Sequence, residues 1–343
     1  MEAEPTRVNN PPQRYSSEIV EWLDLPPKIE LQVYEEESRT ILSSNDSPDI
    51  SFKYSVNPYR GCFHGCAYCY ARPTHQYLDF GAGTDFERKI VAKIKAPELL
   101  RDAFLKPSWI GEPIVFSGVT DCYQPLEASY QLTRRCLEVC AEFQNPVSII
   151  TKGALIRRDI DVLTKLHTTA HVNIYMSIAF ADDKMSKLIE PYAPRPSVRF
   201  RAMQALHAAG IPVAVGVAPM IPGLNDSQIP EILERAAECG AHSAFMTLLR
   251  LPAEVREVFT TRLHEAFPTR AEKVLSQLRD MKGGELNRSE FGSRMHGEGP
   301  RWEAIEWLFD TSCAKLGLNQ RGRLKNPNNI STFRRPEKQL NLF

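Results

Sequence analysis

Three cysteines, Cys62, Cys66 and Cys69, lie within eight residues in the stretch NPYRGCFHGCAYCYARP (57–73). Cysteine thiolates are ligands for zinc and for iron–sulfur clusters. A structural zinc site uses four ligands, often as two pairs, and the sequence has no other C-x2-C pair. His64, inside the loop, is the alternative that would complete a zinc site. Three thiolates fit a [4Fe–4S] cluster better, because they leave one iron open to another ligand.

The elements around this loop follow a strand–helix alternation. Short apolar runs separated by segments of helical period predict six strands, at 52–56, 113–118, 147–151, 172–178, 212–218 and 243–249. Runs that are apolar throughout are typical of strands buried on both faces. Repeated strand–helix units predict right-handed crossovers and a parallel sheet, open or closed into a full or partial barrel. The cysteine loop follows the first strand, so we expect it at the carboxyl ends of the strands, where such barrels carry their chemistry.

The spacing C-x3-C-x2-C, with Tyr68 before the last cysteine, resembles the radical S-adenosylmethionine (SAM) superfamily over about residues 52–250. This resemblance implies a parallel partial (βα)6 barrel, a [4Fe–4S] cluster on Cys62, Cys66 and Cys69, and SAM at the open iron. It also implies an external electron donor and reductive cleavage of SAM to a 5′-deoxyadenosyl radical. That radical abstracts hydrogen from a substrate.

Four segments are similar to the spore photoproduct lyase-related branch of this superfamily: NPYRGCFHGCAYCYAR, VTDCYQPLE, ITKGAL and APMIPGLND. The resemblance implies SAM contacts at six positions of this chain: Tyr68, Thr120, Asp121, Lys152, Ser177 and Ala218. Thr120 and Asp121 would meet the amino group, and Lys152 the carboxylate. Ser177 would meet the ribose or carboxylate. The backbone of Tyr68 and Ala218 would lie near the adenine.

The chain also departs from that branch. Spore photoproduct lyases carry a hydrogen-donor cysteine three residues before the aspartate, and Gly118 stands at that position here. Cys122, directly after the aspartate, is a candidate hydrogen donor or a structural thiol. Two SAM contacts also have structural alternatives: Asp121 could cap the following turn, and Lys152 could be a solvated loop lysine. The remaining cysteines are expected in the core, namely Cys136, Cys140, Cys239 and Cys313.

Composition divides the chain into four parts. Residues 1–50, with eleven acids and four bases, form an acidic, Pro-containing N-terminal extension. Residues 51–252 form the radical SAM core, and 253–320 a helical C-terminal segment with a Gly-rich interruption. Residues 321–343 form a basic flexible tail, which indicates a polyanion partner or a solvated end. No apolar run reaches the roughly 18 residues of a membrane span. The N-terminus lacks a signal-peptide core, so we expect a cytoplasmic protein.

The final residues resemble the short peptide by which bacterial replication and repair proteins dock on the DNA polymerase sliding clamp. The match is to Gln339, Leu340, Leu342 and Phe343, with Asn341 between the leucines. Leucine and phenylalanine side chains could fill apolar pockets of a partner. The alternative is a tail that folds back on the protein's own core.

Three functions remain open at this point. The first is a radical SAM enzyme that acts on DNA, in lesion repair or lyase-like chemistry, or on another nucleic acid. The second is a radical SAM enzyme that acts on a small molecule or peptide. The third is a non-catalytic zinc-binding, nucleic-acid-associated protein, for which metal analysis would find zinc without iron and sulfide.

Overall fold

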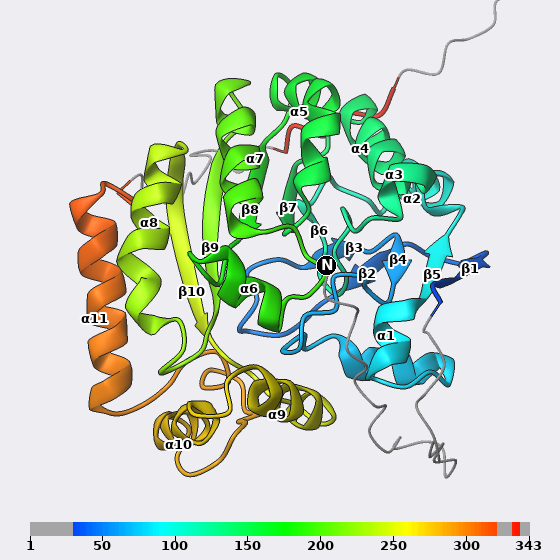
Figure 1. Ribbon diagram of the computed structural model, residues 1–343. Coiled ribbons are helices and arrows are strands. Elements are labelled where there is room, and N and C mark those ends of the chain that lie inside the picture. The colour runs from blue at the N-terminus through cyan, green and yellow to red at the C-terminus, as the bar shows by residue number, and fades with distance from the viewer. Residues whose placement is uncertain (1–29, 321–330, 337–343) are drawn as a thin grey trace, which may run out of the picture.

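The computed structural model describes residues 30–320 and 331–336. Its centre is a seven-stranded sheet in the order β10-β9-β8-β7-β6-β3-β2 (Figure 1). The strands are β2 (Leu42–Ser44), β3 (Tyr54–Val56), β6 (Ile114–Phe116), β7 (Val147–Thr151), β8 (Val172–Ser177), β9 (Val213–Met220) and β10 (Ala241–Leu248). From β3 to β10 neighbouring strands are parallel, and β2 is antiparallel to β3. The expected partial (βα)6 barrel is confirmed, and its six strands lie at the six apolar runs.

Helices connect the parallel strands and, in Figure 1, α4, α5, α7 and α8 lie side by side along the sheet. The helices of this part are α1 (Thr84–Arg88), α2 (Ala96–Leu105), α3 (Glu127–Tyr130), α4 (Leu132–Glu142), α5 (Ile160–His167), α6 (Asp183–Ile189), α7 (Pro196–Ala208) and α8 (Ile229–Glu238). The 3₁₀ helices η1 (Arg72–Leu78), η2 (Ala154–Asp159) and η3 (Asp226–Gln228) precede or extend them.

Helix α8 shows why these segments are helical. Its buried residues Ile229, Ile232, Leu233 and Ala236 recur at the spacing of one helix face, which packs on the sheet. Proline lies in the first turn, where its missing N–H costs nothing. Gly240 follows the helix with a φ of +87°, a conformation that glycine adopts without a side-chain clash.

The core lies between the sheet and these helices. Ile149, Ile174, Met176 and Val215, on adjacent strands, have no exposed surface. Each such side chain contributes roughly 1.5–3 kcal/mol when fully buried. Burial on both faces explains why the strands are apolar throughout, and it fixes the strand ends that carry the loops described below.

A second, smaller sheet was not anticipated from the sequence. Strand β1 (Gln32–Glu36) is parallel to β5 (Lys89–Lys93), which is antiparallel to β4 (Tyr59–Arg60). The described part of the acidic N-terminal extension therefore contains strands, β1 and β2, instead of lying apart from the fold. The partners of its acidic run are remote in sequence: Oε2 of Glu36 lies 3.6 Å from Nε of Arg60, and Oε2 of Glu37 lies 2.7 Å from Nζ of Lys95.

After β10 the chain is helical, with α9 (Val255–Ala266), α10 (Ala271–Met281) and α11 (Pro300–Lys315). In Figure 1, α9 and α10 lie beyond the end of β10, and α11 lies beside α8. Residues 331–336 return to the barrel, where Phe333 stacks on Phe143 with ring centroids 6.0 Å apart. The clamp-like residues Gln339, Leu340, Leu342 and Phe343 lie outside the described residues, so clamp docking stays a prediction.

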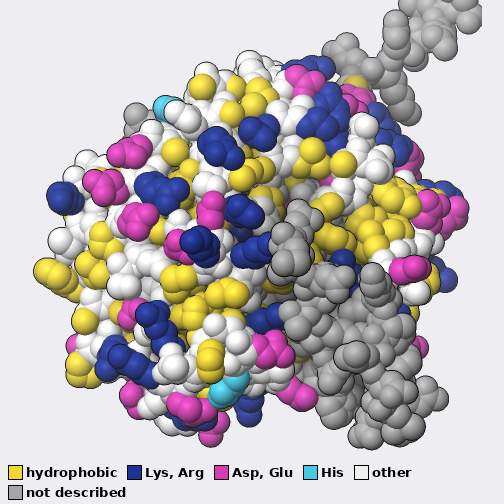
Figure 2. Space-filling view, viewed as in Figure 1, with side chains coloured by type: hydrophobic (Ala, Val, Ile, Leu, Met, Phe, Trp, Pro, Cys, Tyr) yellow, Lys and Arg dark blue, Asp and Glu magenta, His cyan; other side chains and the backbone are white. Residues whose placement is uncertain are grey.

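The surface carries mixed charges. Figure 2 shows basic and acidic side chains interspersed over one face, with hydrophobic side chains between them, in keeping with 42 basic and 42 acidic residues in the chain. Within residues 30–320 and 331–336, we find no helix with the length and apolar character needed to span a bilayer.

Candidate functional site

The three cysteines lie on one loop between β4 and η1. Cys62 and Cys66 are buried, and Cys69 is partly buried. Arg72 holds this loop from inside, since its fully buried guanidinium donates to the carbonyls of Gly65 and Cys66 and pairs with Glu87 at 2.5 Å. A buried guanidinium without partners would be costly, and its five N–H donors need acceptors. The cysteine loop is therefore held in the conformation that places these carbonyls around Arg72.

Two neighbouring segments hold the same loop from outside. The amide of Ala67 donates to the carbonyl of Ile189, the last residue of α6, at 2.9 Å. The side chain of Gln124, after β6, accepts from the amide of Phe63 at 3.0 Å and donates to the carbonyl of Gly61 at 3.2 Å. The thiols are therefore positioned by strand ends that are far apart in the sequence.

Burial raises the pKa of all three thiols, that of Cys66 to about 12. The thiols also affect one another: after burial and Asp121, ionised Cys69 and Cys66 further raise the pKa of Cys62. For Cys69, Arg72 and Lys152 oppose the effect of burial. Three buried, neighbouring thiols with cations beside them form a donor set that suits iron, which binds thiolates.

A mononuclear zinc site finds no support in this geometry. Among the described residues, no group of three or more His, Cys, Asp or Glu side chains is arranged to hold one metal ion. Nδ1 of the buried His64 instead lies 3.4 Å from Oδ2 of Asp121. An iron–sulfur cluster does not require convergence on a single point, because each thiolate binds a different iron.

Asp121 joins the ends of two strands. Its Oδ1 accepts from the Thr151 hydroxyl at 2.6 Å and from the Tyr123 amide at 2.9 Å, and its Oδ2 accepts from the Lys152 amide at 2.7 Å. Burial would raise its pKa, but His64, the Lys152 amide and the Thr151 hydroxyl outweigh it and hold the pKa well below its usual range. The bond to the Tyr123 amide matches the turn-capping alternative. The structure gives each carboxylate oxygen a partner within the chain.

Thr120 is engaged in a similar way. Its hydroxyl donates to the carbonyl of Tyr59 at 2.8 Å, and its side chain is buried. The amide of the preceding Val119 donates to Oδ1 of Asn57 at 2.8 Å. Together with Asp121, Thr120 therefore ties the end of β6 to the segments before and after it.

Lys152, by contrast, has a cation without an anion bound to it. Its side chain is partly buried, and Nζ lies 5.6 Å from the centroid of the Tyr68 ring. The described residues give Nζ this cation–π contact and no ion pair. Burial would lower the pKa of Lys152, but Cys66 and Glu190 outweigh it and raise the pKa. The group is thus a charged ammonium beside the cysteine loop.

Tyr68 and Lys152 stand over a buried ion pair that sequence reasoning missed. Glu190, after α6, pairs with Arg199 of α7, and both are almost completely buried. The hydroxyls of Tyr68 and Ser186 donate to the same carboxylate. Glu190 had no recognisable signal, because it is a lone acid in a loop and meets Tyr68 only through the fold.

The two remaining predicted contacts lie together. The hydroxyl of Ser177, at the end of β8, donates to the carbonyl of Ala218 in β9 at 3.3 Å. Arg199 donates to the carbonyl of Ser177 at 3.0 Å, so the same arginine that pairs with Glu190 also orients this strand end. The bond between Ala218 and Pro219 is cis.

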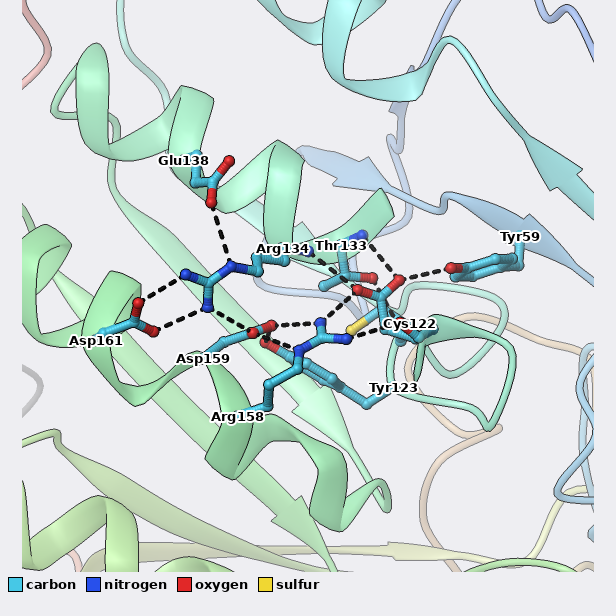
Figure 3. Close-up of polar contacts among 10 residues, drawn as sticks. Tyr59, Cys122, Tyr123, Thr133, Arg134, Glu138, Arg158, Asp159 and Asp161 are labelled. Carbon is cyan, nitrogen blue, oxygen red and sulfur yellow. Dashed lines mark hydrogen bonds and ion pairs between the residues drawn. The ribbon is translucent and has the colours of Figure 1, made fainter. Parts of the chain in front are cut away.

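Cys122 occupies a different environment. Its side chain has no exposed surface, its amide donates to the Ser117 hydroxyl at 2.8 Å, and its carbonyl accepts from Thr133 of α4 at 2.7 Å. Burial raises its pKa well above the ordinary value. Figure 3 shows it beside a network of buried polar side chains, in which the Tyr59 hydroxyl donates to Glu127 at 2.5 Å. This placement favours the structural alternative for Cys122.

That network supports the same strand ends. Arg158 donates to Glu127 at 2.8 Å and to Asp159 at 2.7 Å, and Asp159 also accepts from the Tyr123 hydroxyl at 3.1 Å (Figure 3). Tyr123 is the residue whose amide binds Asp121. The network therefore acts as a support behind Asp121, and each of its carboxylates is paired with Arg134 or Arg158.

Tyr70 directly follows Cys69, and half of its surface, 52%, is exposed. Its hydroxyl donates to the carbonyl of Gly118, at the end of β6, at 2.7 Å. Sequence reasoning did not single out Tyr70.

Comparison with known proteins agrees with this geometry. The family model of the Radical SAM superfamily matches residues 56–236. An uncharacterized protein of Mycobacterium bovis is 36% identical over 234 residues, which cover 68% of this chain and 68% of that protein. An uncharacterized protein of Methanocaldococcus jannaschii is 31% identical over 174 residues, covering 51% and 62%.

Solved structures share the fold. Spore photoproduct lyase complexed with dinucleoside spore photoproduct aligns with a TM-score of 0.62 and 14% identity, over 87% of this chain and 86% of that one. A variant of that enzyme with bound AdoMet and dinucleoside spore photoproduct aligns with a TM-score of 0.61 and 14% identity, over 88% and 86%. At this identity, the likeness concerns the fold.

Proposed function

The chain belongs to the radical SAM superfamily, and on that premise we propose that it is an enzyme that abstracts hydrogen from DNA in a lyase-like or repair reaction. Its cofactors are a [4Fe–4S] cluster and SAM. When bound, they supply a 5′-deoxyadenosyl radical after one electron from an external donor cleaves SAM. The protein's part is to hold, orient and enclose these groups.

The cluster ligands in this proposal are Cys62, Cys66 and Cys69. Arg72 and Gln124 fix the backbone that carries them. The cations beside Cys66 and Cys69 stabilise the thiolate form that iron requires, because opposite charge favours ionisation.

The SAM contacts follow from the positions of the side chains around this loop. The observation that carries the proposal is the Lys152 ammonium, which stands beside Cys66 with no ion pair within the described residues. A charged donor so placed suits the carboxylate of SAM. Ser177 and the backbone of Ala218 and Tyr68 are proposed for the ribose and adenine. The side chains of Thr120 and Asp121 are hydrogen-bonded within the protein. They would contribute to binding the amino group of SAM by positioning the strand ends that surround it.

Two observations support DNA as the substrate. The shared fold with spore photoproduct lyase and the basic segment at 321–343 both favour it. The hydrogen-return step of that lyase is not carried over, since Gly118 replaces the cysteine and Cys122 is fully buried. We also propose residues 51–252 as the catalytic core and 253–320 as its helical C-terminal wall.

The test is anaerobic reconstitution with iron and sulfide, followed by SAM, a reductant and DNA. We expect iron and sulfide to be lost from Cys62→Ala, Cys66→Ala and Cys69→Ala, and 5′-deoxyadenosine to form only with intact ligands. Irradiated and intact DNA are compared for altered bases. Iron and sulfide retained in the triple variant would reject the ligand assignment. SAM cleavage without any change in DNA would instead favour a small molecule or peptide as substrate.

A further inference from the structure

Basic side chains gather where the last parallel strand ends. Arg250 follows β10, and Lys282 and Arg294 belong to the Gly-rich loop 282–299 between α10 and α11. The loop is fastened to the end of β10, because the Leu248 amide donates to the carbonyl of Met295 at 2.9 Å. Lys282 Nζ donates to the carbonyl of Arg294 at 3.2 Å. The three cations are therefore brought together by tertiary contacts.

Among the described residues, these three cations have one carboxylate in an ion pair with them, that of Asp49. Arg294 pairs with Asp49, which precedes β3 at the opposite edge of the partial barrel. The described residues give Arg250 no ion pair, only a contact between Nη1 and Sδ of Met295 at 3.9 Å, and its Nε is buried without a hydrogen-bond partner. Lys282 has no exposed surface and a single carbonyl partner.

The cluster is also electrostatically strained. Burial, together with the charges of Arg250 and Arg288, lowers the pKa of Lys282 to about 8. Burial and Arg294 lower the pKa of Arg250. Like charges held together out of water cost stability unless an anion joins them. Arg250 can therefore bind an anion that the described residues do not supply.

The cluster lies at the same edge of the sheet as the cysteine loop. Arg250 follows β10 at the carboxyl ends of the parallel strands, and the hydroxyl of Tyr70, directly after Cys69, donates to the carbonyl of Gly118, after β6 at that edge. An aromatic side chain stands on the same loop: Phe291 is 61% exposed, and the Arg294 guanidinium lies 4.6 Å from its ring centroid. Cations interleaved with an exposed aromatic are the elements of a single-stranded nucleic-acid site.

We propose that Arg250 binds a backbone phosphate of the substrate strand, with the charges of Lys282 and Arg294 beside it, and that Phe291 stacks on a neighbouring base. This inference rests on the proposed function, because it assumes a nucleic-acid substrate at the barrel mouth. Arg250 supplies a planar fork of donors to the phosphate, and Lys282 adds a point charge behind it. Phe291 carries no sequence preference, since every base has a face to stack.

The experiment measures binding of a fluorescent oligothymidylate of about 12 nucleotides to the reconstituted full-length protein. Its variants are Arg250→Gln and Phe291→Ala, and the matched controls are Arg201→Gln, on the exposed side of α7, and Trp307→Ala, exposed on α11. Iron content and thermal unfolding confirm that each variant is folded. A second ligand is the same strand with neutral methylphosphonate linkages, and a third is inorganic phosphate alone.

We expect Arg250→Gln to bind the oligonucleotide roughly tenfold or more weakly. The slope of log affinity against log salt should fall by about one. Phe291→Ala should weaken binding of the charged and the neutral strand alike, by stacking loss. The two control variants should bind the oligonucleotide with the affinity of the unaltered protein. Arg250→Gln and the unaltered protein should bind the neutral strand with equal affinity.

Two outcomes would overturn the inference. Equal affinity and equal salt slope for Arg250→Gln and the unaltered protein would remove the phosphate site while leaving the proposed function intact. If the unaltered protein bound no oligonucleotide, the DNA substrate would fail, and the phosphate arm would then decide. If the unaltered protein bound inorganic phosphate and Arg250→Gln did not, the site would be kept for a small phosphorylated substrate. If the unaltered protein bound neither the oligonucleotide nor phosphate, the phosphate site and the DNA substrate would both be rejected.

Discussion

Replacing Lys152 by methionine tests the SAM site most directly, because its ammonium stands beside Cys66 and has no ion pair among the described residues. Methionine keeps the length of the side chain and its packing against Tyr68 while removing the charge. A hydrogen bond to a charged group contributes about 1.5–3 kcal/mol. Nζ is only partly buried, so solvent weakens the contact, and we expect the lower end of that range. That corresponds to roughly tenfold weaker SAM binding.

The assay is calorimetric titration of SAM into the anaerobically reconstituted protein. A matched ligand, decarboxylated SAM, lacks the carboxylate that Lys152 is proposed to bind. The unaltered protein and Lys152→Met should therefore bind this second ligand equally, which isolates the pairwise interaction in the manner of a double-mutant cycle. Lys152→Arg, which keeps the charge, should retain part of the affinity.

The same substitution has a side effect that must be measured. Lys152 lowers the pKa of Cys66 and Cys69 against the effect of burial, so its loss could weaken the cluster itself. Iron and sulfide are therefore determined for each preparation, and affinities are compared at equal cluster content. Equal losses for SAM and decarboxylated SAM, or no loss for either, would remove Lys152 from the carboxylate site.

Three further predictions address other parts of the chain. Burial lowers the pKa of His75 to about 4, so that as the pH falls from about 6.5 toward 4 this histidine takes up a proton in the unfolded chain before it does so in the folded one. The free energy of unfolding should therefore fall by about 3 kcal/mol across that pH range and keep its full value above it. Urea unfolding against pH should show that loss, and His75→Gln should flatten it; identical profiles would contradict the assignment. Cys122→Ala should leave both 5′-deoxyadenosine and product yields unchanged, as a buried structural thiol requires, whereas product lost with SAM cleavage intact would restore it as a hydrogen donor. A form lacking residues 339–343 should lose a roughly micromolar affinity for the bacterial sliding clamp, measured by pull-down or calorimetry, and clamp binding that survives the deletion, or never occurs, would refute the docking prediction.

The sequence by itself determined the barrel. Short apolar runs alternating with helical periods place all six parallel strands, because strands buried on both faces leave a local pattern that needs no knowledge of the partner. It also determined the cysteine loop and its place after the first strand. Helix α8 (Ile229–Glu238) carries an equally local pattern, because its buried residues recur at the spacing of one helix face.

Tertiary structure decided which polar groups remain available. Asp121 and Lys152 had equal standing as SAM contacts in the sequence. The fold gives the Asp121 carboxylate partners at Thr151, Tyr123 and the Lys152 amide, and it leaves the Lys152 ammonium without an anion. The placement of Cys122 was likewise invisible, because the direction of one side chain in a loop depends on the helix that packs against it.

Charges that pair across long separations were also beyond the sequence. Glu190 meets Tyr68 over 122 positions, and Asp49 reaches the loop around Arg294 over more than 240. Acids and bases have no period that reveals their partners, and an ion pair forms only after the core has brought its two elements together. For that reason the positions of the parallel strands could be predicted from apolar residues, whereas the support of the cysteine loop and the cation cluster at the end of β10 required the folded chain.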